Sequence, residues 1–236
     1  MSFVRHIPNG LTSINLIAGF TAIYFIFNGY PEGLICCMIA SLLADLLDGW
    51  AARKLNVAGP LGVQLDSLAD MVSFGVVPGL MSLSLLSQDS FTFSTIAGLT
   101  CGALITTSAF WRLAKFNLDT RQNSGFLGLP TPAMSMYILG LYIVKNFSSN
   151  DQWSMLWTEG TLLIQTSILA GLMLSEIPVP SLKNLQNHRN FVIILAFLII
   201  TAALFTYNIA PELLLWQSVL IYICTTVIYF LVKKFE

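Results

Sequence analysis

Long apolar segments constrain the fold of this 236-residue chain more than any other feature. Hydrophobic residues make up 56% of the sequence and charged residues 10%, whereas soluble domains carry about 25% charged residues. A transmembrane helix needs about 20 mostly apolar residues to cross the hydrocarbon core of a bilayer. The sequence can be divided into such segments almost from end to end. We therefore predict an integral membrane protein that crosses the bilayer several times.

The apolar segments and the turns between them predict an all-α transmembrane bundle of about eight helices. The connections contain the glycine, proline and asparagine residues typical of turns, as in "NVAGP" and "NGYPE". No internal repeat or low-complexity tract divides the chain, so we expect one membrane domain over residues 1–236. The predicted helices span residues 10–28, 32–53, 62–86, 92–117, 131–147, 157–175, 189–207 and 211–232.

Lysine and arginine residues predict the orientation of these helices. In the eight-helix arrangement, all but one of them lie on one side, and Lys145 lies on the other beside Glu32, Asp89, Asp151 and Glu212. Because positively charged loops stay in the cytoplasm, we expect both termini there and the protein in the cytoplasmic (inner) cell membrane. No cleavage-site pattern follows the first apolar segment, so we expect it to be retained. The basic residues on the cytoplasmic side are Arg5, Arg53, Lys54, Arg112, Lys115, Arg121, Lys183, Arg189, Lys233 and Lys234.

Net charge and cysteine content restrict the function classes only weakly. The formal net charge of −1 gives no sign of nucleic-acid binding, and we expect no nucleic-acid partner. The four cysteines fall inside apolar segments without the spacing of zinc ligands. We expect them to pack as small hydrophobic side chains.

Four aspartates at the ends of two apolar segments are the main indication of function. Asp45 and Asp48 lie near the end of the second predicted helix, and Asp66 and Asp70 lie near the start of the third. Spacings of three and four residues place each pair on one helical face. Because the connection is short, the two helices must be antiparallel neighbours. All four carboxylates can therefore face one volume near the cytoplasmic boundary.

This arrangement has three physical explanations. A charged side chain at the bilayer centre costs about 2.5–3.5 kcal/mol even on the lenient insertion scale, so the carboxylates must be protonated, paired with Arg53 and Lys54, or bound to divalent cations. The pattern therefore fits a salt-bridged helix end, the ion pathway of a transporter, or a metal site for phosphoryl transfer. Oxygen ligands alone favour Mg²⁺ or Mn²⁺. Gly49 and Gly62 leave space for a bulky ligand, and Arg53 favours one that carries phosphate.

The stretch from residue 45 to residue 70 resembles the signature of the CDP-alcohol phosphotransferase family. The family pattern D-x2-D-G-x2-A-R-x8-G-x3-D-x3-D is matched at Asp45, Asp48, Gly49, Ala52, Arg53, Gly62, Asp66 and Asp70. Within the family, the chain is most similar to the phosphatidylserine synthases, which resemble it in "DSLADMVSFGVVP", "FLGLPTPA", "LMLSEIPVPSLK" and "IPNGLTSINLIAGF". The resemblance covers most of the first 185 residues.

The resemblance implies a six-helix catalytic core over about residues 1–185, two added helices over about residues 189–232, and a homodimer. The implied reaction transfers the phosphatidyl group of CDP-diacylglycerol to the hydroxyl of L-serine and releases CMP. Two divalent cations, Mg²⁺ or Mn²⁺, are implied: one bound by Asp45, Asp48 and Asp66, the other by Asp45, Asp66 and Asp70. Asp70 is also the implied general base. The implied CDP contacts are Gly49, Arg53, Gly59, Asn9 and Thr12.

Recognition of the acceptor stays open at this level. The carboxylate of serine needs a cation or amide dipoles, and its ammonium group needs an acceptor such as Asp119 or Glu176. A sister synthase that uses glycerol 3-phosphate or inositol phosphate is an alternative, as is an ether-linked lipid donor. A cation-coupled transporter fits less well, because internal repeats and broken helices are not evident. The candidates for the serine carboxylate are Arg112, Lys115, Arg121 and Lys183, which also satisfy the positive-inside rule without a ligand.

Overall fold

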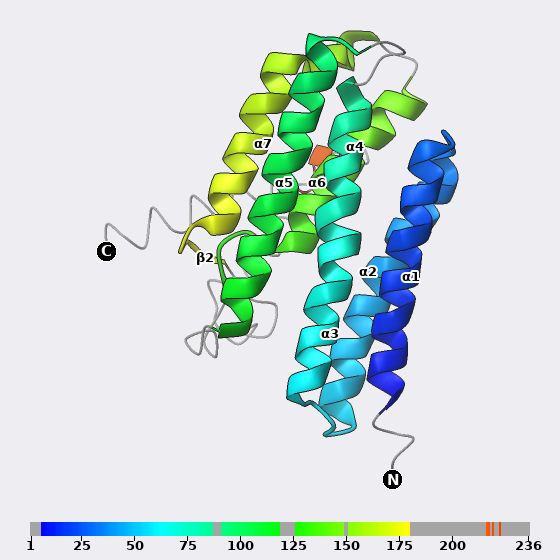
Figure 1. Cartoon of the computed structure of the whole chain (residues 1–236), viewed down its shortest axis with the longest axis vertical. Coiled ribbons are helices and arrows are strands. Elements are labelled where there is room, and N and C mark those ends of the chain that lie inside the picture. The colour runs from blue at the N-terminus through cyan, green and yellow to red at the C-terminus, as the bar shows by residue number, and fades with distance from the viewer. Residues whose placement is uncertain are drawn as a thin grey trace.

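The computed structural model describes residues 6–86, 91–118, 126–148 and 151–179, together with residues 216, 217, 219 and 222. These residues form long helices that pack side by side (Figure 1). The α-helices are α1 (His6–Phe27), α2 (Pro31–Lys54), α3 (Pro60–Asp70), α4 (Val77–Leu86), α5 (Phe93–Leu118), α6 (Thr131–Phe147) and α7 (Glu159–Leu174). The π-helix η2 (Met71–Val76) joins α3 to α4, and the 3-10 helix η4 (Asp151–Trp157) precedes α7.

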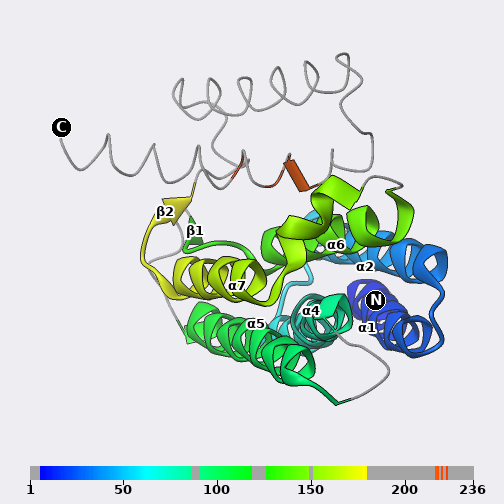
Figure 2. The ribbon, with the colours of Figure 1, turned by 90° about the horizontal axis from the view of Figure 1, so that it is seen from above.

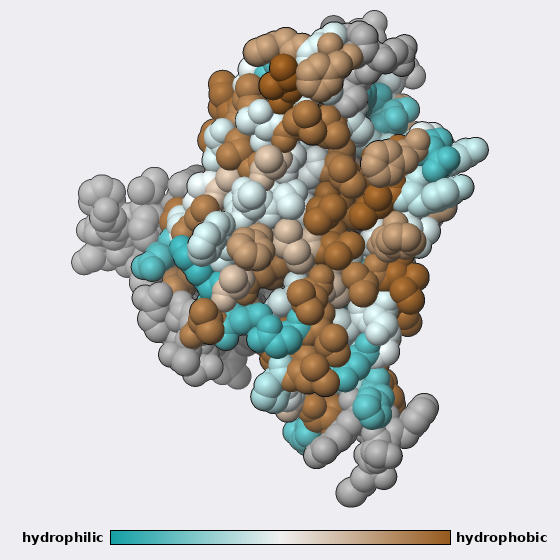
Figure 3. All heavy atoms as spheres, in the orientation of Figure 1, coloured by the Kyte–Doolittle hydropathy of each residue, from teal (hydrophilic) through white to brown (hydrophobic). Residues whose placement is uncertain are grey.

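The prediction of a helical, multi-pass membrane protein is confirmed. Four helical segments are long and apolar enough to span a bilayer: His6–Phe27, Pro31–Lys54, Pro60–Leu86 and Phe93–Leu118. The visible surface is strongly apolar over the middle of the bundle, and many hydrophilic residues gather towards its ends (Figure 3). The helix predicted over 189–207 lies outside the described residues. Of the helix predicted over 211–232, the four described residues are helical, and the ring centroid of Trp216 lies 5.8 Å from that of Tyr137 on α6.

The first predicted helix begins at His6 rather than at residue 10, and the third begins at Pro60 rather than at residue 62. Three further details differ from the sequence prediction. The helix predicted over 62–86 contains the π-helical segment η2 directly after Asp70. The helix predicted from residue 157 begins at Glu159, because Thr158 caps it by accepting a hydrogen bond from the backbone N–H of Thr161. The all-α prediction also missed β1 (Phe126–Leu127) and β2 (Pro178–Val179), which pair antiparallel. Two-residue strands are too short to produce a periodic pattern in the sequence.

The rod formed by α3, η2 and α4 is the centre of the bundle. It packs against α1 on one side and α5 on the other, and α4 and η2 also contact α6 (Figure 2). Phe74, Met81, Ile105, Met134 and Ile138 are fully buried between these elements. The end of α2, the start of α3 and the start of α1 lie at the same end of the molecule (Figure 1). That end contains the acidic signature.

Helices α4 and α5 approach each other through glycines. A Cβ atom on Gly102 would lie 2.6 Å from the carbonyl oxygen of Gly79, and one on Gly98 would lie 3.0 Å from that of Leu83. Farther along the same contact, a Cβ atom on Gly75 would lie 3.2 Å from that of Ala109. Small residues at such crossings let the backbones of membrane helices pack closely. This contact holds α5 alongside η2, immediately beyond Asp70.

Lys145 has a structural use at the opposite end of the bundle. Its Nζ donates hydrogen bonds to the carbonyl oxygens of Ser84 at 2.8 Å and Leu85 at 2.9 Å. These carbonyls belong to the last turn of α4, where the helix itself supplies no donor. A cation is also favourable at the negative end of the helix dipole. Lys145, the one basic residue predicted on the non-cytoplasmic side, therefore caps the C-terminus of α4.

Candidate metal and nucleotide site

The turn between α2 and α3 brings the signature aspartates together. Asn56 adopts φ of 52°, in the left-handed region that asparagine tolerates. The backbone N–H of Val57 then donates to the carbonyl of Ala52 at 3.0 Å. Pro60 occupies the first turn of α3, where its missing N–H costs no helical hydrogen bond. The chain thus reverses direction within a few residues, as the sequence analysis expected.

Three carboxylates meet across this turn. One oxygen atom from each of Asp45, Asp48 and Asp66 lies within 4.8 Å of the other two. Asp70 follows Asp66 by one turn of α3 and is 8% exposed. Its charge is repelled chiefly by those of Asp45 and Asp66. The structure therefore brings together three of the four aspartates that were predicted to converge, and Asp70 lies one turn farther along α3.

Among the described residues, no basic side chain forms a direct ion pair with this cluster, although the charge of Arg53 attracts that of Asp48. A Cβ atom on Gly49 would lie 3.3 Å from Nη1 of Arg53, so the guanidinium lies over Gly49 instead. Lys54 places Nζ 4.4 Å from the ring centroid of Trp50. Oδ1 of Asp66 is buried, and no described residue forms a hydrogen bond with it. Close carboxylates, an unpartnered oxygen and an all-oxygen ligand set fit a divalent cation better than a salt-bridged helix end.

Helix α1 supplies polar side chains to the aspartates. The Thr12 hydroxyl donates to Oδ2 of Asp48 at 2.5 Å. One turn deeper, the Asn15 amide Nδ2 donates to Oδ1 of Asp70 at 3.0 Å. In the sequence, Asn9, Thr12 and Asn15 share one face of the first helix, and either hydrogen bonds between helices or contact with the nucleotide would explain them. For Asn15, the structure shows a hydrogen bond between helices.

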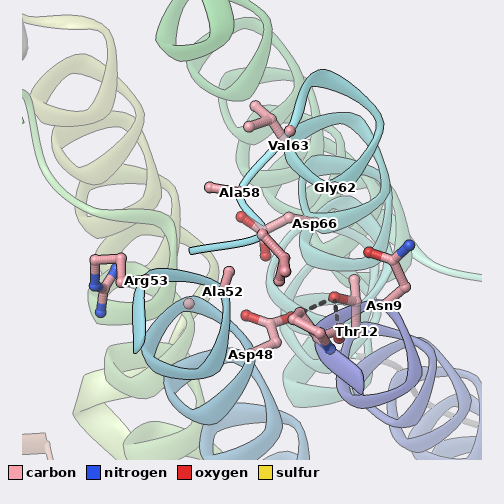
Figure 4. Close-up of a pocket in the computed structure, with 13 residues that line it drawn as sticks. Asn9, Thr12, Asp48, Ala52, Arg53, Ala58, Gly62, Val63 and Asp66 are labelled. Atoms are coloured by element: carbon pink, nitrogen blue, oxygen red, sulfur yellow. Dashed lines mark hydrogen bonds between the residues drawn. The ribbon is translucent and has the colours of Figure 1, made fainter. Parts of the chain in front are cut away.

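A cavity of about 170 Å³ lies beside Asp48 and Asp66. Arg53 lies on the opposite side of this cavity from α1 (Figure 4). A Cβ atom on Gly62 would lie 3.6 Å from Oδ1 of Asn9, so any larger residue would narrow the space. All five residues expected to contact CDP line the cavity, namely Asn9, Thr12, Gly49, Arg53 and Gly59.

Of the four candidates for the serine carboxylate, Arg112 lies within electrostatic reach of the aspartates. It is 9% exposed on α5, and Nη1 donates to the Thr131 hydroxyl at 2.6 Å. Its Nε has no hydrogen-bond partner among the described residues. Its charge interacts favourably with that of Asp70. Lys115 is exposed on the same helix, and the other two candidates, Arg121 and Lys183, lie outside the described residues.

Two segments singled out in the sequence are joined beside Arg112. The "FLGLPTPA" segment contains β1 and the "LMLSEIPVPSLK" segment contains β2. The backbone N–H of Gly128 donates to the carbonyl of Ile177 at 2.8 Å, and that of Leu129 donates to Leu172 at 3.0 Å. Gly128 has φ of 74°, which favours glycine. These bonds fix the start of α6, where Thr131 contacts Arg112.

The fold and site define a class of protein: a multi-pass membrane protein with a carboxylate cluster and an adjoining cavity at one end of its helices. The family model described as CDP-alcohol phosphatidyltransferase matches residues 5–169. The chain belongs to this family.

Curated relatives cover most of the chain. It is 31% identical over 229 residues to the CDP-diacylglycerol–serine O-phosphatidyltransferase of Mycobacterium bovis, covering 92% of this chain and 76% of that protein. It is 31% identical over 191 residues to the Bacillus subtilis protein of the same name, covering 79% of this chain and 99% of that protein. It is also 30% identical over 182 residues to the archaetidylserine synthase of Methanothermobacter thermautotrophicus, covering 76% of this chain and 71% of that protein.

Proposed function

We propose that the protein transfers the phosphatidyl group of CDP-diacylglycerol to the hydroxyl of L-serine, producing phosphatidylserine and CMP. The observation that carries this proposal is the junction of α2 and α3, where clustered carboxylates adjoin a cavity lined by Gly49, Arg53 and Gly59. The names of the bacterial relatives support the choice of serine as acceptor. The archaeal relative leaves an ether-linked donor as the alternative lipid.

The aspartates are proposed to hold two divalent cations, Mg²⁺ or Mn²⁺. Asp45, Asp48 and Asp66 are assigned to the first, and this set coincides with the three convergent carboxylates. Asp45, Asp66 and Asp70 are assigned to the second. Bound cations supply electrostatic stabilisation of the charge that develops on the diphosphate oxygens and on the departing CMP.

The cavity is proposed to receive the CDP moiety. Asn9 and Thr12 line it from α1, while Gly49 and Gly59 leave room for the nucleotide. Arg53 supplies a positive charge that is not consumed by an ion pair within the described residues. It can therefore offset the negative charge of the diphosphate.

Asp70 is proposed to act as the general base. Its carboxylate accepts the proton of the serine hydroxyl as that oxygen attacks the β-phosphorus. The new oxygen–phosphorus bond replaces the bond to CMP, which departs with the electron pair. Asp70 lies next to Asp45 and Asp66 and within electrostatic reach of Arg112, which supports a position between donor and acceptor.

Arg112 and the start of α6 are proposed to bind the serine carboxylate. No described residue forms a hydrogen bond with Nε of Arg112, and the N-terminus of a helix favours a negative charge. Lys115, Arg121 and Lys183 remain weaker candidates, and Asp119 or Glu176 are candidates for the ammonium group.

Replacing Arg112 with leucine is expected to raise the KM for serine by about 10- to 100-fold, the equivalent of one hydrogen bond to a charged group. The KM for CDP-diacylglycerol should change little. Lys115→Leu is the matched control, because Lys115 is exposed on the same helix. Initial rates over a range of serine concentrations provide the measurement. A KM for serine that rises equally in both variants would contradict the assignment.

The remaining organisation is also proposed. A six-helix core over about residues 1–185 is followed by two added helices over about residues 189–232, in a single membrane domain that forms a homodimer. Both termini and the active site face the cytoplasm, where serine and the nucleotide are available. The basic residues in the last turns of α2 (Arg53 and Lys54) and of α5 (Lys115) support this orientation.

An acceptor assay tests the proposed reaction. Purified protein in detergent is given CDP-diacylglycerol, Mn²⁺ or Mg²⁺, and serine, glycerol 3-phosphate, inositol phosphate or no acceptor. CMP release is expected with serine, is expected to stop with EDTA, and should fall by about 10²- to 10⁴-fold in Asp70→Asn. Release with a phosphorylated acceptor instead would identify a sister synthase. No release with any acceptor, from folded protein, would reject the reaction and favour the transporter.

A further inference from the structure

Asn15 forms a buried hydrogen bond with the proposed general base. Its side chain is 0% exposed and that of Asp70 is 8% exposed. The amide Nδ2 donates to Oδ1 of Asp70 at 3.0 Å. Asn15 is thus a side chain from another helix that hydrogen-bonds this carboxylate. One oxygen of Asp70 is thus held by the protein, and the second is left for other partners.

The backbone of Asn15 is fixed independently of that bond. Its carbonyl oxygen accepts hydrogen bonds from the hydroxyls of Ser41 on α2, at 3.1 Å, and Ser73 on η2, at 3.0 Å. Both serines are fully buried. A Cβ atom on Gly19, one turn farther along α1, would collide with the Ser73 side chain. Three helical elements therefore meet at Asn15 and determine where its amide points.

A buried asparagine at position 15 is less favourable for the stability of the fold than an apolar residue of similar size. Its Oδ1 is buried without a hydrogen-bond partner among the described residues. An unsatisfied buried polar atom costs about 1–3 kcal/mol. A leucine of similar shape would avoid that cost. The amide does contribute a directed donor to Asp70, which an apolar residue cannot supply.

We propose that Asn15 is a positioning residue that holds Oδ1 of Asp70 and so directs the other carboxylate oxygen towards the acceptor hydroxyl and the cation site. This inference rests on the proposed function, in which Asp70 accepts the serine proton. Asn15 itself does not contact the reacting atoms. Since the hydrogen bond fixes the orientation of the base rather than the affinity for substrate, its loss slows the chemical step.

Asn15→Leu is the principal test, because leucine keeps the size of the side chain and removes the amide. We expect kcat to fall by about 10- to 100-fold, as for other residues that orient a metal-site ligand. The KM values for serine and CDP-diacylglycerol should stay close to those of the unaltered protein. Asn15→Asp keeps the shape but places a second carboxylate against Asp70, so its loss of kcat should be larger. Ser82→Ala is the control, since it removes a fully buried hydroxyl that bonds within α4, to the carbonyl of Pro78 at 2.9 Å, and leaves the contacts of Asn15 in place.

A second readout avoids dependence on turnover. Mn²⁺ without substrates should raise the melting temperature of the unaltered protein and of Ser82→Ala. The rise should be smaller in Asn15→Leu and in Asp70→Asn, because both variants lose the oriented carboxylate. If the unaltered protein releases CMP, the division between kcat and KM decides: an unchanged kcat in Asn15→Leu, or a loss matched by Ser82→Ala, overturns the inference. If it releases none, the proposed function fails separately, and a full Mn²⁺ response in Asn15→Leu overturns the positioning role.

Discussion

Replacing Asp66 with asparagine is expected to lower serine-dependent CMP release by about 10²- to 10⁴-fold, the range seen when a general acid–base or electrostatic group is removed. Asp66 contributes one of the three convergent carboxylate oxygens, and its buried Oδ1 has no hydrogen-bond partner among the described residues. It belongs to both proposed cation sites. An amide in its place cannot supply the negative charge that each cation needs.

The same substitution should change the melting temperature differently in EDTA and in Mn²⁺. In EDTA, Asp66→Asn should melt at a temperature equal to or above that of the unaltered protein, because one of several mutually repelling carboxylates is gone. With Mn²⁺, its gain in melting temperature should be smaller. Glu159→Gln, in the first turn of α7, removes a carboxylate from outside the cluster and serves as the control. A variant that keeps both CMP release and the full Mn²⁺ response would refute the metal site.

Replacing Gly102 with alanine is expected to destabilise the bundle by about 3 kcal/mol, at the upper end of the usual cost of overpacking. The added Cβ would lie 2.6 Å from the carbonyl oxygen of Gly79. Because the neighbour is backbone rather than a flexible side chain, α4 and α5 must separate. The measurement is the melting temperature in detergent, monitored through the loss of helical signal as the protein unfolds.

Gly171→Ala is the matched control for this prediction. Gly171 lies in α7, and a Cβ atom there would meet nothing within 4 Å. Alanine is also the better helix former, so the control should unfold at the same temperature or higher. Equal melting temperatures for the two variants would show that the close approach of α4 and α5 can relax without cost.

The acidic site could be predicted from the sequence in most respects. The spacing of Asp45 and Asp48, and of Asp66 and Asp70, places each pair on a helical face, and the short connection makes the two helices neighbours. The cavity beside them is lined by the five residues assigned to CDP through the family resemblance. Local spacing and a tight turn were sufficient because all the participants except those of α1 lie within one helical hairpin.

Contacts between distant parts of the chain could not be predicted in this way. Asn15 and Asp70 are 55 residues apart. Arg112 and Thr131 lie on two different helices, and the motif before Thr131 does not indicate which basic residue it contacts. Among the four basic side chains that are candidates for binding the serine carboxylate, the sequence offered no reason to choose Arg112. Basic residues at this boundary also satisfy the positive-inside rule. Burial distinguishes it: Arg112 is 9% exposed, whereas Lys115 lies on the surface.

The amino-acid sequence by itself determined that this is a membrane protein of long helices with an acidic signature at one end. Hydrocarbon requires long apolar helices, and i, i+3 and i, i+4 spacing is a local property of any helix. The tertiary structure decided which side chains complete the site. Direct hydrogen bonds act only over about 3 Å, so the pairing of Asn15 with Asp70 and of Arg112 with Thr131 depends on how closely helices pack. The distance between packed helices is set by glycines such as Gly19 and Gly102. Their lack of a side chain matters only where a neighbouring helix lies against them.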